Sequence, residues 1–485
     1  MGRIAVVLNL LSMVVLIFAV TMLLPLAVSF ALADGAERAY DVAIVITALT
    51  GGLGWFATRG ASRELQLRDG FLLVVFTWTT LPAFATLPLL GYLPQLSFTD
   101  AYFETMSGLT TTGSTVLSGL DRLPPSINLW RCQLIWLGGM GIIVLAVAIL
   151  PLLGVGGSQL FKAETPGPMK DTKLTPRITE TAKGLWLVYF SISVACVLAY
   201  RWAGMSWLDA VMHAFSTMGL GGFSSHDASF GYWNSTRVEA VAIAFMLIAG
   251  INFGTHFLAW RGRSLKPYRT DPEAFVFVAI LVLSCFGIAW YLLGNRVYPD
   301  YWTALRFASF NVISIATTTG FANADFNLWP VFAPLWMLFL CSFCTCAGST
   351  GGGMKMIRAQ ILFKQILREL LRILHPRLYS PVKIAGQPVE NKVVFSVLSF
   401  VLVYASSIIL MTLLLAASGL DAVTAFSAVV VTINNTGPGL NLVGPATNFE
   451  VLNDFQTWVC TFSMLLGRLE LMTLLVVMTP AFWRK

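Results

Sequence analysis

Long apolar stretches alternate with short polar ones along the whole chain. Most of the apolar stretches hold about 20 residues, the length that an α-helix needs to cross the hydrocarbon core of a bilayer. The pattern predicts ten membrane spans, the eighth of which is interrupted by glycines. Their approximate ranges are 4–30, 40–58, 71–90, 129–153, 184–204, 236–260, 273–293, 331–360, 393–418 and 455–480.

Composition and charge place this chain in a membrane and orient it there. With 56% apolar and 11% charged residues, it is not a soluble globular protein. Most of the 31 Lys and Arg fall at the end that holds both termini, so both termini are predicted to be cytoplasmic. The net charge of +7 indicates inner loops that face anionic lipid or an acidic partner rather than nucleic acid. The opposite end is rich in acidic residues, whose negative field would concentrate cations there. The alternative is that this end is acidic only because the positive-inside rule places the basic residues at the other end.

Four short segments close on a glycine, share one plan and recur about every 100 residues. Each lies between two predicted spans, so the chain is predicted to be four copies of one unit. Four such loops held inside a membrane can direct rings of backbone carbonyl oxygens at one axis, as a K⁺ channel filter does. The segments, named loops 1 to 4, are Leu109–Ser114, Gly219–Phe223, Ala316–Phe321 and Ile433–Pro438.

A short helix is expected to descend toward each loop. A helix of roughly 12 to 17 residues is too short to span the bilayer but reaches its middle. Non-helical backbone at that depth needs protein or water around it. The negative C-terminal end of each helix would stabilise a cation there. The expected capping residues at the helix starts are Asp100, Asp209, Thr303 and Asp421.

Glycine is expected at each turn because the chain must reverse there with no room for a side chain. The residues before the glycines differ in side chain, so their backbone carbonyls are the candidate ion ligands. The alternative is four unrelated membrane loops that each hold a glycine. The candidate K⁺ ligands are the carbonyls of Thr111, Thr112, Leu220, Gly221, Thr318, Thr319, Asn435 and Thr436, and the filter glycines are Gly113, Gly222, Gly320 and Gly437.

These loops and their flanking spans resemble the TrkH/KtrB family of K⁺ uptake proteins. The resemblance covers about 71 to 482, and the first two spans resemble the extra N-terminal pair of TrkH-type members. It implies an all-α integral membrane fold in which four concatenated helix–pore loop–helix units surround a pseudo-fourfold pore. Loop 2 departs from the Thr-rich pattern of the family, which predicts a less symmetric filter.

The units divide the chain into five parts. The predicted boundaries place an N-terminal helix pair at 1–69, pore unit 1 at 70–160, pore unit 2 at 161–265, pore unit 3 with an interrupted inner helix at 266–378, and pore unit 4 at 379–485.

The segment Cys346–Lys355 interrupts the eighth span. Its glycines hold helix poorly, so its backbone must line a cavity or pack on protein. A plain helix kink is the alternative. A nucleotide-binding P-loop is excluded because Met354 interrupts the pattern and no strand precedes it. Members of the family carry an intramembrane gating loop here, so the predicted gate residues are Gly348, Ser349, Thr350, Gly351, Gly352 and Gly353.

Arg468 lies inside the last predicted span. A charge at that depth costs about 2.5–3.5 kcal/mol on insertion scales, so it normally faces a partner or water. The resemblance implies that Arg468 belongs to the gate, points into the cavity below the filter and repels cations. The alternative is a structural ion pair with an acid on another helix.

The predicted function is K⁺ uptake across a bacterial inner membrane, with K⁺ as transported ion and no bound cofactor. The alternatives are a secondary symporter that couples K⁺ to Na⁺ or H⁺ and, in another class, a membrane-embedded transferase. Catalysis would need clustered ligands, whereas Asp100, Asp209 and Asp421 are spread one per unit. The Cys341, Cys344 and Cys346 spacing is metal-like, but its apolar flanks favour a packed, reduced helix face.

The resemblance also implies partners. Family members assemble with a cytosolic ring of Rossmann-type nucleotide-binding regulatory subunits and form homodimers. Membrane lipid surrounds the pore, and nucleic acid is not expected as a partner.

Overall fold

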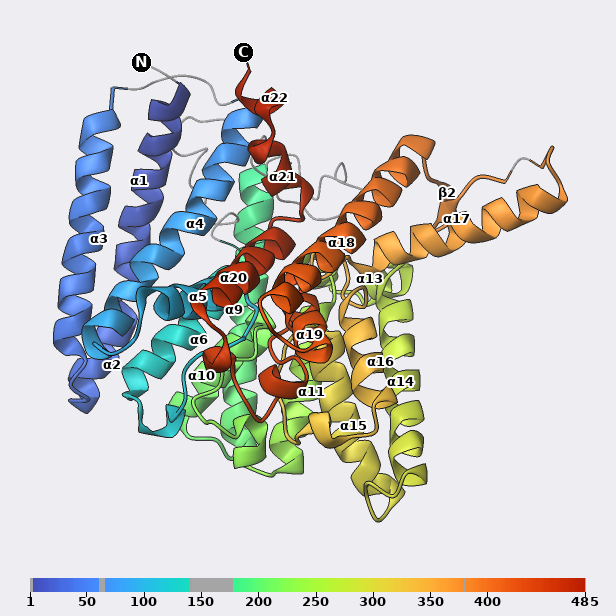
Figure 1. Cartoon of the computed structure of the whole chain (residues 1–485), viewed down its shortest axis with the longest axis horizontal. Coiled ribbons are helices and arrows are strands. Elements are labelled where there is room, and N and C mark those ends of the chain that lie inside the picture. The colour runs from blue at the N-terminus through green and yellow to red at the C-terminus, as the bar shows by residue number, and fades with distance from the viewer. Residues whose placement is uncertain (1–2, 61–65, 140, 142–177, 379, 485) are drawn as a thin grey trace.

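The computed structural model describes residues 3–60, 66–139, 141, 178–378 and 380–484. Within these ranges the chain is almost entirely helical, and the only strands are β1 (Lys383–Ile384) and β2 (Gln387–Pro388). The prediction of an all-α membrane fold is therefore confirmed. Figure 1 shows the two ends of the chain at the same end of the helix bundle.

The described helices account for most of the predicted spans. Six are long and apolar enough to cross a membrane, and two bent pairs raise this number to eight. Of the other two predicted spans, 129–153 lies mostly outside the described residues. The other, 331–360, is represented by the short apolar helix α16 (Phe332–Cys341) and the start of α17 (Met356–Leu374).

The N-terminal pair consists of α1 (Arg3–Thr21), α2 (Leu23–Leu32) and α3 (Glu37–Thr58). α1 packs along α3, at the left of Figure 1, and also contacts α4 (Leu67–Tyr92). Gly51 of α3 lies against Leu16 of α1, and Gly54 lies against Ser12, so closely that an added side chain would force a shift at either position. Small residues at such contacts let membrane helices approach each other.

One order of elements then occurs four times: an outer helix, a re-entrant helix that ends in a glycine loop, and an inner helix. The outer helices are α4 (Leu67–Tyr92), α9 (Ile178–Ala203), α14 (Ala274–Gly294) and α18 (Asn391–Ala417). The re-entrant helices are α5 (Phe98–Leu109), α10 (Trp207–Gly219), α15 (Tyr301–Ala316) and α19 (Ala422–Ile433). The inner helices begin with α6 (Pro125–Gly139), α11 (Thr236–Gly250), α16 and α20 (Asp454–Arg468).

Short elements connect these helices. Single 3₁₀ turns, η1 (Leu120–Arg122), η3 (Ser229–Tyr232), η4 (Phe326–Leu328), η5 (Asn441–Val443) and η6 (Phe449–Val451), follow the glycine loops, and α13 (Lys266–Thr270) and α22 (Pro480–Trp483) complete the described helices. The exact boundaries of the five predicted parts stay a prediction, and the junction between the first two units lies outside the described residues.

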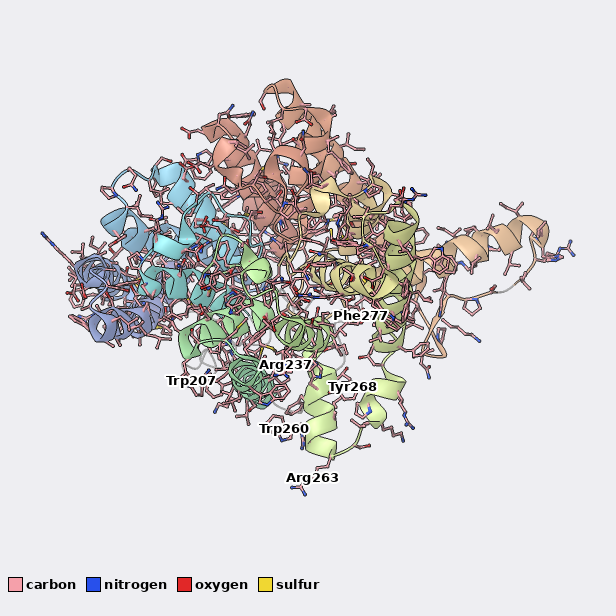
Figure 2. All side chains as sticks on the ribbon, turned by 90° about the horizontal axis from the view of Figure 1, so that it is seen from below. Trp207, Arg237, Trp260, Arg263, Tyr268 and Phe277 are labelled. Carbon is pink, nitrogen blue, oxygen red and sulfur yellow. The ribbon has the colours of Figure 1, made fainter. Side chains whose placement is uncertain are left out.

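The inner helices are broken more often than the sequence pattern predicts. α11 turns by 93° into α12 (Phe253–Gly262), and α20 turns by 113° into α21 (Met472–Met478). The spans at 236–260 and 455–480, predicted without an interruption, are therefore each broken into two helices. At the first break Asn252 caps α12, and at the second Glu470 and Leu471 both have positive φ. Figure 2 shows Trp260 and Arg263 of this region at the outer edge of the molecule.

The re-entrant helices are capped, though not always by the predicted residues. Asp421 accepts hydrogen bonds from the amides of Val423 and Thr424, as predicted. In the first two units Ser97 and Ser206 are the caps, and they accept from the amides of Asp100 and Asp209. The third unit uses Asp300, which accepts from the amide of Thr303. Asp100, Asp209 and Thr303 therefore support the caps from one turn inside the helix.

The seven cysteines are free and buried. Among the described residues no group of side chains could hold a metal ion by the usual His, Cys, Asp and Glu ligands. Cys341, Cys344 and Cys346 lie in the hydrophobic core, but the expected helix face is wrong for Cys344 and Cys346 because α16 ends at Cys341.

Candidate functional site

Every re-entrant helix ends in the same hydrogen-bonded turn. In loop 1 the amide of Thr111 donates to Gly108 O at 3.0 Å, and the amide of Thr112 donates to Ser107 O at 2.8 Å. Such a nested pair of bonds is a Schellman motif, which satisfies the last carbonyls of a helix. The same two bonds recur from Leu220 and Gly221, from Thr318 and Thr319, and from Asn435 and Thr436.

The backbone alternates in handedness through each loop. Thr111 has φ of 56° and Gly113 has φ of 81°, whereas Thr112 between them is not in the positive-φ region. This alternation gathers N–H groups on one side of the chain and C=O groups on the other. The same pattern holds at Leu220 and Gly222, Thr318 and Gly320, and Asn435 and Gly437. Positive φ at a non-glycine residue costs about 1–3 kcal/mol, and such strain clusters at functional sites.

The candidate carbonyls are left unpaired by this arrangement. The N–H groups bond back to the helix, whereas none of the eight candidate carbonyl oxygens accepts a hydrogen bond from another described residue. All eight residues are buried. A buried carbonyl without a partner is unfavourable, and a partly dehydrated cation is a species that such oxygens can satisfy.

The four loops meet in a closed ring. A methyl group added at Gly113 would lie within 3.0 Å of the Gly221 carbonyl oxygen, so loop 1 packs directly on loop 2. The same clash links Gly222 to Thr319 and Gly320 to Thr436, and a methyl group at Gly437 would lie in tight contact, 3.0 Å, with Thr112 O. Each glycine thus contacts the carbonyl that precedes the glycine of the next loop, and the fourth contacts the first. Glycine is needed both for its positive φ and for this approach.

Side chains strengthen some of the contacts between loops. Asn435 Nδ2 of loop 4 donates to Thr112 Oγ1 of loop 1 at 3.0 Å, and Ser114 Oγ donates back to Gly437 O at 2.8 Å. Inside loops 1 and 3, two threonine hydroxyls bond to each other at 2.8 Å, Thr110 to Thr112 and Thr317 to Thr319. Loop 2 has no hydroxyls at the corresponding positions, which are Gly219 and Gly221.

The segment Cys346–Lys355 forms a folded loop between α16 and α17. The Met354 amide donates to Ser342 O at 2.7 Å, and the Met356 amide donates to Thr345 O at 2.8 Å. Thr345 Oγ1 also donates to Gly352 O at 2.7 Å, and the Lys355 ammonium bonds to Gly351 O. The segment is therefore an ordered structure with its own hydrogen bonds, not a plain helix kink.

This segment contacts the ends of the re-entrant helices. Gly352 N donates to Thr318 Oγ1 at 2.8 Å, and Gly352 packs against Asn434 O with no room for a side chain. Thr350 Oγ1 donates to Met218 O at the end of α10 at 2.9 Å. The segment thus touches units 2, 3 and 4 at the C-terminal ends of their re-entrant helices.

A single carboxylate oxygen accepts hydrogen bonds from amides at both ends of the segment. Glu273 Oε1, just before α14, accepts from the amides of Ala347 at 3.0 Å and Ile357 at 2.8 Å. The break between α11 and α12 adds backbone bonds, from Cys346 N to Gly250 O and from Phe253 N to Gly348 O. Glu273 gave no signal in the sequence because its role depends on contacts far apart along the chain.

Arg468 connects the segment to loop 1. Its Nη1 donates to Thr350 O and to Thr111 Oγ1, each at 3.1 Å, and its Nη2 bonds to the carbonyls of Gly138 and Gly139 in α6. Through Arg468 the segment reaches the first unit as well. The nearby Glu470 pairs instead with Arg358 of α17, at 2.6 Å, a contact that the sequence did not predict.

On the side of the loops away from this segment, His226 joins the outer loops of two units. His226 Nδ1 lies 2.5 Å from Asp121 Oδ1, its Nε2 lies 3.4 Å from Asp209 Oδ1, and its ring stacks on Tyr232 at 3.6 Å. Burial opposes the charge on the imidazole. The hydrogen bonds and negative charges of the two aspartates outweigh burial and raise the pKa of His226 above 6.5.

Known proteins are similar to this chain in both sequence and fold. The family model described as TrkH, cation transport protein, matches residues 38–485. The Trk system potassium uptake proteins TrkH of Halomonas elongata and Escherichia coli K12 are 47% and 45% identical over 99% and 98% of both chains. The crystal structure of the potassium transporter TrkH from Vibrio parahaemolyticus superimposes with a TM-score of 0.90 at 43% identity and covers all of both chains.

The His226 contacts predict a pH-dependent stability. A folded-state pKa above 6.5 means that the stabilisation is complete below pH 6.5 and is lost as the pH rises through the folded-state pKa. Replacing His226 by Gln removes this contribution. We expect the difference in Tm between the parent and His226→Gln, measured in detergent, to be largest below pH 6.5 and to shrink at alkaline pH. A constant difference across this range would contradict the assignment.

Proposed function

The chain belongs to the TrkH family of cation transport proteins, and we propose that it takes up K⁺ across a bacterial inner membrane through the ring of loops 1 to 4. The observation that carries this proposal is the closed ring of glycine contacts, in which the carbonyl oxygens of eight buried residues accept no hydrogen bond from the described part of the chain. The chain is a transport protein and not an enzyme, so a membrane-embedded transferase is set aside.

K⁺ loses water at the ring and is coordinated there by the carbonyls of the eight candidate residues. Four re-entrant helices direct the negative ends of their dipoles at this point, which favours cations over anions. The membrane potential supplies about 2.3 kcal/mol per charge per 100 mV for inward movement. No coupling ion is required, and this argument favours conduction over symport with Na⁺ or H⁺.

The Cys346–Lys355 segment acts as the gate of this pathway. Its contacts with the ends of the re-entrant helices support this role, because a cation leaving the ring on that side meets the segment. Within the predicted gate residues, Gly351 and Gly352 allow the close approach to Thr318 and Asn434 that a larger side chain would prevent. Arg468 places a positive charge between the segment and loop 1, where it opposes cation entry.

The remaining parts of the proposal concern placement and partners. Both termini face the cytoplasm of a bacterial cell, in agreement with the excess of Lys and Arg at that end. The relatives are named as Trk system proteins, which supports a multi-component assembly. We propose a homodimer that docks a cytosolic ring of nucleotide-binding regulatory subunits on its basic inner surface.

Reversal potentials test conduction against symport. The purified protein in planar bilayers, under a K⁺ gradient, should give a current that reverses at the K⁺ equilibrium potential. Variation of Na⁺ or pH on one side should leave that potential in place. A reversal potential that moves with the Na⁺ or proton gradient would instead support a coupled symporter.

Substitution of the filter glycines should weaken ion discrimination. Gly113→Ser forces a side chain against Gly221 O, which lies well within 3.0 Å of an added Cβ, whereas Gly437→Ser meets Thr112 O at 3.0 Å. We expect the preference for K⁺ over Na⁺, measured by flux into proteoliposomes, to fall in both variants and more in Gly113→Ser.

Gly419→Ser is the matched control for this experiment. Gly419 also has positive φ, 101°, but nothing lies within 4 Å of an added methyl group. It should retain the discrimination of the parent despite the same backbone strain. If both filter variants discriminate as well as the parent, loops 1 to 4 are not the filter.

Removal of the Arg468 charge should speed cation flux. Arg468→Gln loses the repulsion of cations and weakens the bonds to Thr350 and Thr111. We expect several-fold faster K⁺ flux per protein in proteoliposomes. Arg296→Gln removes the same charge at an exposed position and should leave the flux unchanged. Equal or slower flux in Arg468→Gln would place Arg468 outside the gate.

A further inference from the structure

Polar side chains of each re-entrant helix form hydrogen bonds with the segment that leaves its own loop. These segments, called exit strands although they are irregular backbone and not β-strands, are residues 114–117, 223–226, 321–324 and 438–441. Glu104 accepts from Thr115 Oγ1 and Val116 N, both at 3.0 Å, and His213 Nε2 bonds Ser224 Oγ at 2.9 Å. Asn311 Nδ2 donates to Asn323 Oδ1 at 2.6 Å, and Ser427 Oγ accepts from Leu440 N at 2.9 Å. The first three occupy equivalent positions before their glycines.

Glu104 differs from the other three because it is a carboxylate with a buried partner. Arg131 Nε of α6 lies 2.8 Å from Glu104 Oε1, and both side chains are only 1% exposed. The Arg131 guanidinium also donates to Asn128 Oδ1 at 3.1 Å and to Thr115 Oγ1 at 3.2 Å. Its hydrogen-bonding capacity is therefore used on several sides.

Arg131 also extends the contact to the second unit. Its Nη1 donates to Ser224 O at 3.2 Å, and its guanidinium lies 4.4 Å from the centre of the Phe223 ring. Phe223 and Ser224 directly follow Gly222. The ion pair thus holds the exit strand of loop 1 through Glu104 and the exit strand of loop 2 through Arg131.

Loop 2 has no polar side chain that could form a hydrogen bond within the ring. It lacks the hydroxyl pair that braces loops 1 and 3, because Gly219 and Gly221 occupy those positions. Three glycines in five residues also give it the most conformational freedom. Contacts from outside the loop are therefore needed most at loop 2. Arg131 supplies such a contact, in addition to His213.

A buried ion pair is weak evidence for stability, because well-packed apolar residues often stabilise a core as well or better. What the pair does provide is a fixed geometry, since its charges and hydrogen bonds are satisfied in one arrangement. We propose that Glu104 and Arg131 are positioning residues that fix the spacing of loops 1 and 2 and thereby set the discrimination between K⁺ and Na⁺. This inference rests on the proposed function of the four loops as a filter.

The difference in size between K⁺ and Na⁺ explains why the spacing of loops 1 and 2 matters. K⁺ and Na⁺ carry the same charge and differ in size, so carbonyl oxygens select between them by the distance and field that they can maintain. A ring free to contract closes on the smaller ion as well. The pair holds two adjacent loops from behind, and its loss should admit Na⁺ without abolishing conduction of K⁺.

Glu104→Gln tests this inference. The change is nearly isosteric, keeps one acceptor oxygen and removes the charge that balances Arg131. We expect the K⁺ over Na⁺ permeability ratio from bi-ionic reversal potentials to fall about threefold or more, the range of effects for residues that act through packed neighbours. K⁺ flux should remain measurable.

Glu239→Gln is the matched control. Glu239 is also buried and also paired with an arginine, Arg306 at 2.7 Å, but this pair joins α11 and α15 away from the exit strands. Both variants should lower Tm, because each leaves a positive charge without its partner. Only Glu104→Gln should lower the permeability ratio.

Thr115→Val provides a variant that leaves both charges in place. It removes the hydroxyl that links the exit strand of loop 1 to Glu104 and Arg131. A lowered ratio is expected here as well, and the double variant with Glu104→Gln should change the ratio by less than the sum of the two changes.

The outcomes separate this inference from the proposed function. An unchanged ratio in Thr115→Val and in Glu104→Gln, with a lowered ratio in Gly113→Ser, would overturn the positioning role and leave the filter in place. An equal loss in Glu239→Gln would also overturn it, because the effect would then follow stability alone. An unchanged ratio in Gly113→Ser would remove the filter on which the inference rests.

Discussion

The structure depends on one turn, repeated at the end of each re-entrant helix. Its two backbone bonds return the amide groups of the loop to the helix, for example from Thr111 to Gly108 and from Thr112 to Ser107. The carbonyls on the opposite side of the chain then have no protein donor among the described residues. A membrane interior offers no water to compensate for this, so four such turns are stable only where they face one another around a shared polar centre.

The glycines of this centre could be predicted because a fourfold repeat makes each copy evidence for the others. Loop 2 was found in this way despite its different side chains. The positive φ at Thr111 and Leu220 could not be predicted, because neither Thr nor Leu favours that conformation. In the first two units the capping residues, Ser97 and Ser206, lie one turn before the predicted Asp100 and Asp209. Ser and Asp both suit a helix start, and only the structure shows which side chain accepts the hydrogen bond from the backbone amide.

The contacts that join separate units lay beyond the sequence pattern. Arg468 is recognisable in the sequence as a charge in an apolar span. Its bonds to Thr350 and Thr111 could not be predicted, because they join residues more than 100 positions apart. The pairing of Arg131 with Glu104 and the double role of Glu273 are of the same kind. Hydropathy also predicted two unbroken inner helices, because their apolar composition continues through the bends that Asn252 and Glu470 accompany.

The ring is not chemically uniform around its axis. Its order runs through loops 1, 2, 3 and 4 and back to 1, so loops 1 and 3 stand opposite each other. These two carry the matched threonine pairs, whereas loops 2 and 4 between them do not. A half-turn about the axis therefore exchanges the similar loops 1 and 3, but it exchanges loop 2, which has no polar side chain, with loop 4, which carries Asn434 and Asn435. The ring is therefore held by matching contacts along the diagonal from loop 1 to loop 3, and by unequal contacts along the diagonal from loop 2 to loop 4.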